Sequence, residues 1–161
     1  MIEYRDFVNQ CLNNEELFKN FKQNNIYRHV LEHVSKELGS EYLKIIKEQT
    51  PWLIKKIDNV KINDLVGGSN LVEYKDVGYI SPSSLRYAKV LSDILILFRK
   101  KKFKKIAEIG TGYGGQFLIF DQFVDFSNYY FFYLKEVLLF GEKYLDNYLL
   151  RNSFKTLHIN K

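Results

Sequence analysis

The stretch that decides the fold reads FKKIAEIGTGYGGQ and runs from Phe103 to Gln116. Its β-compatible run, Phe103 to Ile109, ends in four glycines within the six residues 110–115, and an apolar segment at helical spacing follows from Gln116 to Phe123. Glycine permits positive backbone torsions and close approach of a ligand, and a helix that starts behind such a turn offers free N–H groups. The stretch therefore predicts a strand, a nucleotide-type glycine turn and a helix.

The same alternation continues to the end of the chain. A second β-like run spans Tyr129 to Leu134, a helical stretch spans Lys135 to Leu150, and a third β-like run spans Phe154 to Ile159. Alternating strands and helices indicate parallel strands joined by crossover helices, the first half of a doubly wound sheet. We therefore expect residues 81–161 to form an α/β unit with a partial Rossmann-like sheet of about three parallel strands.

Residues 1–80 have a different pattern, with apolar positions at three- and four-residue steps that indicate short amphipathic helices. We expect Gly39 to end one helix, Ser40 to cap the next, and Thr50-Pro51 to start another. The glycine-containing segment from Asn63 to Ile80 predicts a structured loop or small hairpin, and Ser81-Pro82 then predicts the start of a buried helix. The predicted organisation is a helical N-terminal module, residues 1–80, before the α/β unit.

The charge distribution argues against a nucleic-acid partner. The chain of 161 residues has 24 basic and 19 acidic residues, and six of the basic ones fall between Arg99 and Lys105. A nucleic-acid groove needs cations spread along it, interleaved with stacking aromatic residues. We interpret the basic run as a solvated helix end and turn.

Cysteine and histidine usage also limits the possible functions. Cys11 is the single cysteine, so no intrachain disulfide forms, which favours a reducing cytoplasm. No apolar run is long enough for a membrane span. We expect His29 and His33 to lie on one helix, but no third ligand follows at a suitable spacing, so we expect no metal site.

The glycine spacing fits two classes of cofactor. Gly110, Gly112 and Gly115 fit the GxGxxG of dinucleotide enzymes, whereas Gly110, Gly112 and Gly114 fit the GxGxG of S-adenosylmethionine enzymes. Glu108 favours the second class, because a carboxylate at the strand end would repel a pyrophosphate and attract the cationic methionine portion of S-adenosylmethionine. A turn that only connects strand and helix is the alternative.

Several segments of the chain resemble those of a known protein family. The segments EIGTGYGGQ (108–116) and ISPSSLRYAKVLSD (80–93), with YRHVLEHV (27–34) and NDLVG (63–67), resemble the bacterial putative sugar O-methyltransferases. The resemblance implies a Rossmann-like methyltransferase behind a helical extension, using S-adenosylmethionine to methylate a sugar hydroxyl during surface-polysaccharide synthesis. It implies a cofactor site at Glu108, Gly110, Thr111, Gly112, Gly114 and Gln116. Arg86 and Tyr87 would bind the sugar or nucleotide-sugar substrate, a salt-bridged arginine being the alternative.

The chain departs from the family pattern at the second strand. Tyr133 and Lys135 stand where an acid that holds the ribose hydroxyls and a proline are usual, and a phenol does not replace a bidentate acceptor. Glu136 is the nearest acid, although it suits the first turn of a helix equally well. No convincing catalytic base is present; His158 is the one histidine of the sheet half.

The length of the chain also departs from the family pattern. A full methyltransferase sheet has about seven strands, and residues 103–161 suffice for three. We therefore expect a truncated enzyme that is weakly active or inactive alone, with its first strand exposed at an edge where a partner chain completes the sheet. A non-catalytic interaction module or a gene remnant is the alternative.

Overall fold

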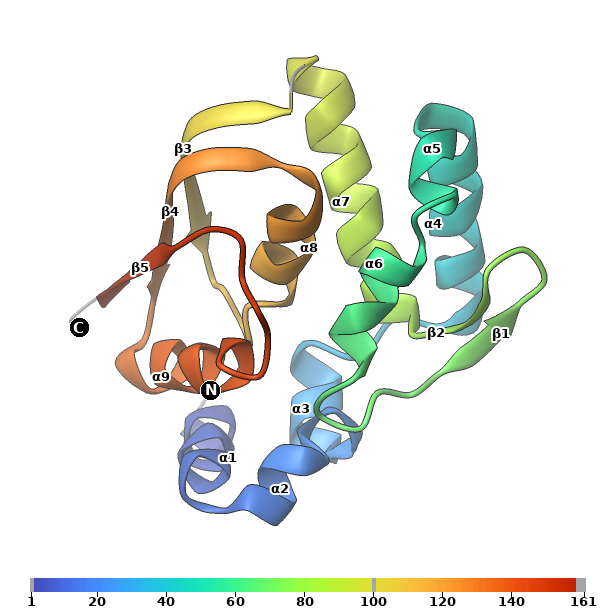
Figure 1. Cartoon of the computed structure of the whole chain (residues 1–161). Helices are drawn as coiled ribbons and strands as arrows, with labels where there is room; N and C mark the ends of the chain where they lie inside the picture. Colours follow the sequence, from blue (N-terminus) through green and yellow to red (C-terminus); the bar gives the residue numbers. More distant parts are fainter. Residues whose placement is uncertain (1, 100, 159–161) are drawn as a thin grey trace. The chain divides into compact units, whose positions relative to one another are not determined.

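The computed structural model describes residues 2–99 and 101–158 (Figure 1). Contacts divide the chain into two compact units. The sheet unit comprises Met1–Phe18 and Lys101–Lys161, and the helical unit comprises Lys19–Lys100. This division differs from the predicted boundary at residue 80, because the helix predicted after Ser81 packs within the helical unit and the first helix packs within the sheet unit.

The sheet unit contains the predicted α/β arrangement, shown in yellow to red in Figure 1. Its elements after the first helices are β3 (Lys102–Ile109), α8 (Gly115–Phe123), β4 (Asp125–Tyr133), α9 (Lys135–Leu145) and β5 (Phe154–His158). The strand order is β3-β4-β5 and both pairs are parallel. The predicted partial Rossmann-like sheet of three parallel strands is therefore confirmed, whereas Ile159 lies outside the described residues.

Helix α9 is shorter than predicted, since it ends at Leu145 rather than Leu150. The Asn147 side chain donates hydrogen bonds to the carbonyl oxygens of Lys143 and Tyr144, at 2.9 and 3.1 Å. These bonds satisfy carbonyls that the last turn of a helix leaves without a partner, so the chain turns there at little cost.

One face of the sheet carries the core of the unit. Strand register places Ile106, Tyr129 and Phe154 in one row across this face, and Glu108, Phe131 and Thr156 in the next. The Phe117 ring of α8 packs edge-on against Tyr129, Phe131 and Phe154, with centroids 4.9 to 5.5 Å apart. Such edge-to-face pairs add to the free energy gained by burying the rings.

The N-terminal helix α1 (Ile2–Asn13) packs on α9 and is followed by α2 (Glu15–Lys19). Arg5 forms an ion pair with Glu136 at 2.5 Å. Lys143 of α9 donates to the carbonyl oxygens of Cys11 and Leu12, at 3.1 and 3.3 Å, where α1 approaches its end. A lysine among the last carbonyls of a helix complements the negative end of its dipole.

The helical unit contains short helices and one hairpin. Its elements are η1 (Phe21–Gln23), α3 (Asn25–Val30), α4 (Lys36–Gln49), α5 (Pro51–Ile54), α6 (Asp58–Lys61), η2 (Ile62–Asp64), β1 (Val72–Tyr74), β2 (Gly78–Ile80) and α7 (Pro82–Phe98). Strands β1 and β2 pair antiparallel, so the small hairpin expected before residue 80 is present. Ser81 caps α7 as predicted, since its hydroxyl accepts from the Ser84 amide at 3.1 Å.

The predicted helix boundary at Gly39 and Ser40 is wrong. Helix α4 runs through both residues, and Ser35 caps it by accepting from the Leu38 amide at 3.2 Å. Gly39 serves packing instead, because a Cβ there would collide with the Tyr74 hydroxyl. The glycine is thus explained by a close approach from the hairpin rather than by a helix end.

Only part of the basic run forms the expected helix end and turn. Arg99 ends α7 with a φ of 51°, but the lysines at 102, 104 and 105 lie on β3. Their side chains are exposed along the strand at the edge of the sheet. Lysines on an edge strand discourage uncontrolled pairing with other chains.

Candidate functional site

The glycine turn begins with an accessible residue at the carboxyl end of β3. Gly110 has a φ of +80°, is exposed, and donates its amide hydrogen to the Phe132 carbonyl at 3.1 Å. A Cβ added at Gly110 would meet nothing within 4 Å. The backbone at this position is therefore open to close approach by a ligand.

The rest of the turn is buried against α9. Tyr113 is fully buried, and its ring packs edge-on against Tyr144 with centroids 4.7 Å apart. Gly114 has a φ of +86°, and a Cβ there would lie 3.0 Å from the Leu145 side chain. Thr111 and Gly112 are buried as well. These residues shape the turn and pack it on the helix, so their types are explained without a ligand.

Helix α8 starts directly after the turn. Gly114 is its N-cap residue, and no side-chain hydrogen bond caps the helix. Gln116 lies in the first turn and is partly exposed. The start of α8 therefore offers backbone N–H groups close to Gly110 in the sequence.

Glu108 lies near the carboxyl end of β3, in the same row of the sheet as Phe131, against which α8 packs. Its carboxylate accepts a hydrogen bond from the Tyr129 hydroxyl at 2.7 Å. Burial raises the pKa of the Glu108 carboxyl to about 7, although the bond from Tyr129 lowers it. A carboxylate that loses hydration in this way is stabilised by a nearby cation, so this site suits a positively charged group.

At the end of β4, Tyr133 stands beside His158 of β5 in the strand register. Tyr133 is partly buried. The nearby Glu136 is engaged elsewhere, because its carboxylate holds Arg5 of α1. Hydrogen bonds from its own backbone amide and from Arg5 lower the pKa of the Glu136 carboxyl. Glu136 thus serves the packing of α1 on α9.

The predicted substrate residues Arg86 and Tyr87 lie in the other unit, on α7. The Arg86 guanidinium donates to the Leu31 carbonyl at 3.3 Å and lies over the Tyr87 ring, 5.0 Å from its centroid. Tyr87 is buried. The structure thus groups Glu108 and the glycine turn in one unit and gives Arg86 and Tyr87 packing contacts within the helical unit.

Sequence reasoning missed Asp121, a fully buried acid on α8. Its carboxylate accepts hydrogen bonds from the backbone amides of Arg151 and Asn152, at 2.9 and 2.8 Å, and from the Asn152 side chain at 2.9 Å. It thereby ties the loop before β5 to α8. An acid inside the apolar run 116–123 is the signal from which such a role could be predicted.

The two histidines of the N-terminal module do not share a helix, contrary to the prediction. Helix α3 ends at Val30, so His29 lies on it and His33 lies beyond it. The Leu31 backbone leaves the helical region at the C-cap. Within residues 2–99 and 101–158, no group of three or more histidine, cysteine or acidic side chains is placed to hold a metal ion.

In the same described residues, no helix combines the length and the apolar character needed to cross a membrane. No protein-family model matches the chain, and neither a curated protein nor a solved structure does.

Proposed function

We propose that the sheet unit binds S-adenosylmethionine and that the protein acts in the cytoplasm as an O-methyltransferase on a hydroxyl of a sugar or nucleotide sugar, in surface-polysaccharide synthesis. The observation that carries the proposal is the partly buried Glu108 carboxyl near the end of a parallel strand, held by the Tyr129 hydroxyl and followed two residues later by the open backbone of Gly110. Ligands of open α/β sheets bind at the carboxyl ends of the strands.

The residues at this edge match one end of the cofactor. S-adenosylmethionine carries a sulfonium and an ammonium group, and a cation beside Glu108 favours the ionised carboxylate. The N–H groups at the start of α8 suit the carboxylate of the methionine portion. The cofactor, when bound, supplies the activated methyl group. Thr111, Gly112 and Gly114 contribute by holding the turn in shape, and we assign the partly exposed Gln116, in the first turn of α8, to the cofactor site.

The match is poorer at the ribose end. Tyr133 occupies the end of β4, where two ribose hydroxyls call for an acceptor of two hydrogen bonds. A phenol oxygen at this place accepts less well than a carboxylate. We therefore propose that this chain by itself binds the cofactor weakly and has little activity.

The test is calorimetric titration of the full chain with S-adenosylmethionine and with its demethylated product, which lacks the sulfonium charge. Glu108→Gln keeps an oxygen for the Tyr129 hydroxyl but removes the negative charge. We expect it to weaken binding of S-adenosylmethionine roughly tenfold and binding of the product less, since charge-assisted contacts contribute about 1.5–3 kcal/mol.

Glu73→Gln is the matched control, because Glu73 is an exposed acid on β1 of the helical unit. It should leave both affinities unchanged. Equal affinity of the native chain and Glu108→Gln for S-adenosylmethionine would contradict the proposed site.

The edge of the sheet supports a partner chain. Among the described residues, β3 pairs with β4 alone, so its other edge has unpaired backbone groups. The second face of the sheet is also accessible: the row Ile109, Phe132 and Leu157 includes two side chains that are 79% and 42% exposed, Ile109 and Leu157. Parallel sheets are normally covered on both faces. We propose that a chain carrying further parallel strands pairs with β3.

The same surface favours a second candidate function, a non-catalytic interaction module. This function predicts partner binding without cofactor binding. Ile109→Lys places a charge on the apolar row and should abolish pairing, as measured by analytical ultracentrifugation with the candidate partner. Leu149→Lys, at a side chain that is 97% exposed, is the control. If Ile109→Lys and the native chain form the complex equally well, this surface is not the interface.

A further inference from the structure

The helical unit contains a cavity that the proposed function does not use. It has a volume of about 480 Å³ and is lined by residues of α3 and of the segment that joins α3 to α4, namely Asn25, Arg28, His29, Glu32, His33, Val34 and Ser35. Cavities that hold small molecules have volumes of roughly 300–1,000 Å³. This cavity is therefore large enough for a phosphorylated sugar or a similar metabolite.

The side chains around this cavity favour an anion. Arg28, His29 and His33 are exposed along one short segment, and the Arg28 guanidinium and the His33 imidazole supply nitrogen donors. Within the described part of the chain, no carboxylate forms an ion pair with Arg28. The His29 Nδ1 lies 2.7 Å from the Asn25 carbonyl oxygen, which orients its ring. The guanidinium of Arg28 is thus available for a ligand.

Glu32 is the one acid on the cavity wall, and its charge is offset from within the unit. Burial raises the pKa of the Glu32 carboxyl, whereas Lys22, Ser83 and Arg86 lower it. Lys22 is itself buried and donates to the Asn63 carbonyl at 2.5 Å and to the Ser69 hydroxyl at 3.1 Å. Two cations of the unit therefore act on Glu32, so the acid does not cancel the charge of Arg28.

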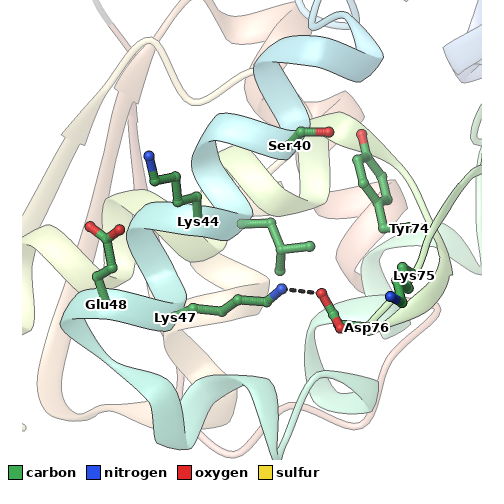
Figure 2. Close-up of a pocket in the computed structure, with 8 residues that line it drawn as sticks. Ser40, Lys44, Lys47, Glu48, Tyr74, Lys75 and Asp76 are labelled. Carbon is green, nitrogen blue, oxygen red and sulfur yellow. Dashed lines mark hydrogen bonds and ion pairs between the residues drawn. The ribbon is translucent and has the colours of Figure 1, made fainter.

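A second cavity of the same unit provides a comparison (Figure 2). It has a volume of about 390 Å³ and is lined by α4 and the hairpin turn, including Lys44, Lys47, Glu48, Lys75 and Asp76. Lys47 and Asp76 form an ion pair across it, drawn as a dashed line. One of its cations is thus paired with an acid of the same wall, whereas Arg28 forms no ion pair among the described residues.

We propose that the cavity at Arg28, His29 and His33 binds the phosphate group of a small molecule. Arginine is suited to this role, because its planar guanidinium donates two parallel hydrogen bonds to a phosphate. The His33 imidazole adds a donor, and Asn25 lies on the wall. The His29 Nδ1–H faces the Asn25 carbonyl, so His29 donates to the ligand only with a protonated ring, through Nε2. This inference does not depend on the glycine turn and stands if the cofactor proposal fails.

The test uses calorimetric titration of the full chain at low ionic strength with inorganic phosphate, pyrophosphate and glucose 1-phosphate. We expect Arg28→Met to weaken binding at least tenfold, and Arg28→Lys to weaken it less, since lysine keeps the charge without the paired donors. Lys44→Met, at the second cavity, removes the same charge and should leave the affinity unchanged. Circular dichroism confirms that each variant at these positions is folded.

Two results would overturn the inference. The first is that the native chain binds none of the three probes. The second is that Arg28→Met and Lys44→Met lose the same affinity, which would indicate a general effect of net charge. Tighter binding of glucose 1-phosphate than of inorganic phosphate supports the proposal and identifies a sugar phosphate as the ligand. The reverse order supports it with free phosphate as the ligand.

Discussion

At the scale of single residues, Glu108 couples folding to pH. Its carboxyl has a pKa of about 7 in the folded chain, against 4.5 for the unperturbed group. The folded state therefore binds more protons between these values, so stability falls as the pH rises through this window. Each unit of pKa difference corresponds to about 1.4 kcal/mol.

Glu108→Gln removes this dependence. We compare the free energy of unfolding of the variant with that of the native chain. The difference, variant minus native, should rise by roughly 2 kcal/mol from about pH 5 to about pH 8. Urea titrations followed by circular dichroism at the two pH values measure the difference. A constant difference between the two chains would show that the Glu108 carboxyl is not desolvated.

Tyr133 is the residue whose replacement should restore a missing contact. Tyr133→Asp supplies a carboxylate at the end of β4, and we expect S-adenosylmethionine to bind roughly tenfold more tightly, as hydrogen bonds to a charged acceptor contribute about 1.5–3 kcal/mol. Calorimetric titration measures the change. The control is Tyr79→Asp on β2, where the side chain is 60% exposed. An unchanged or lower affinity of Tyr133→Asp would mean that no ribose lies at this strand end.

At the scale of elements, glycine is required for different reasons at two positions of the turn between β3 and α8. Gly110 and Gly114 both have a positive φ, but only Gly114 also faces a neighbour, the Leu145 side chain, which would lie 3.0 Å from an added Cβ. An alanine in the left-handed region costs about 1–2 kcal/mol by itself. Steric contact with α9 adds to this cost at Gly114 alone.

We therefore expect Gly114→Ala to lower the free energy of unfolding by roughly 2–3 kcal/mol and Gly110→Ala by about 1 kcal/mol. Thermal and urea unfolding of the two variants measure the difference. Equal losses would show that Leu145 moves aside freely and that backbone conformation is the whole effect.

At the scale of the whole molecule, each unit has its own core and its own spectroscopic or chemical reporter. Trp52, the single tryptophan, lies in the helical unit, and Cys11, the single cysteine, is fully buried in the sheet unit. Burial raises the pKa of the Cys11 thiol to about 11, so the reactive thiolate is scarce in the folded unit.

Gly114→Ala should therefore shift the urea midpoint reported by Cys11 reactivity toward a thiol reagent, and leave the midpoint reported by Trp52 fluorescence in place. This separation follows if the two cores unfold independently. Equal shifts of both midpoints would show that the chain unfolds as one cooperative unit.

Local sequence determined the alternating strands and helices after residue 102, the glycine turn and the cap at Ser81, because each depends on periodicity or on torsions that few residues adopt. For residues 63–80 it left a structured loop and a small hairpin as alternatives. Boundaries that depend on distant partners were missed. The sequence around Gly39 predicts a helix end, because the contact with Tyr74 that explains the glycine comes from a distant segment. Strand β4 begins at Asp125, earlier than predicted, because it pairs with β3 there.

The candidate site divides in the same way. Residue type and order were sufficient to select Glu108 and the glycines. Only tertiary structure decided that burial beside Tyr129 raises the pKa of Glu108, that Gly114 lies close to the Leu145 side chain, and that Arg28 forms no ion pair among the described residues. Desolvation and charge pairing depend on atoms brought together from far along the chain, and local patterns do not contain them.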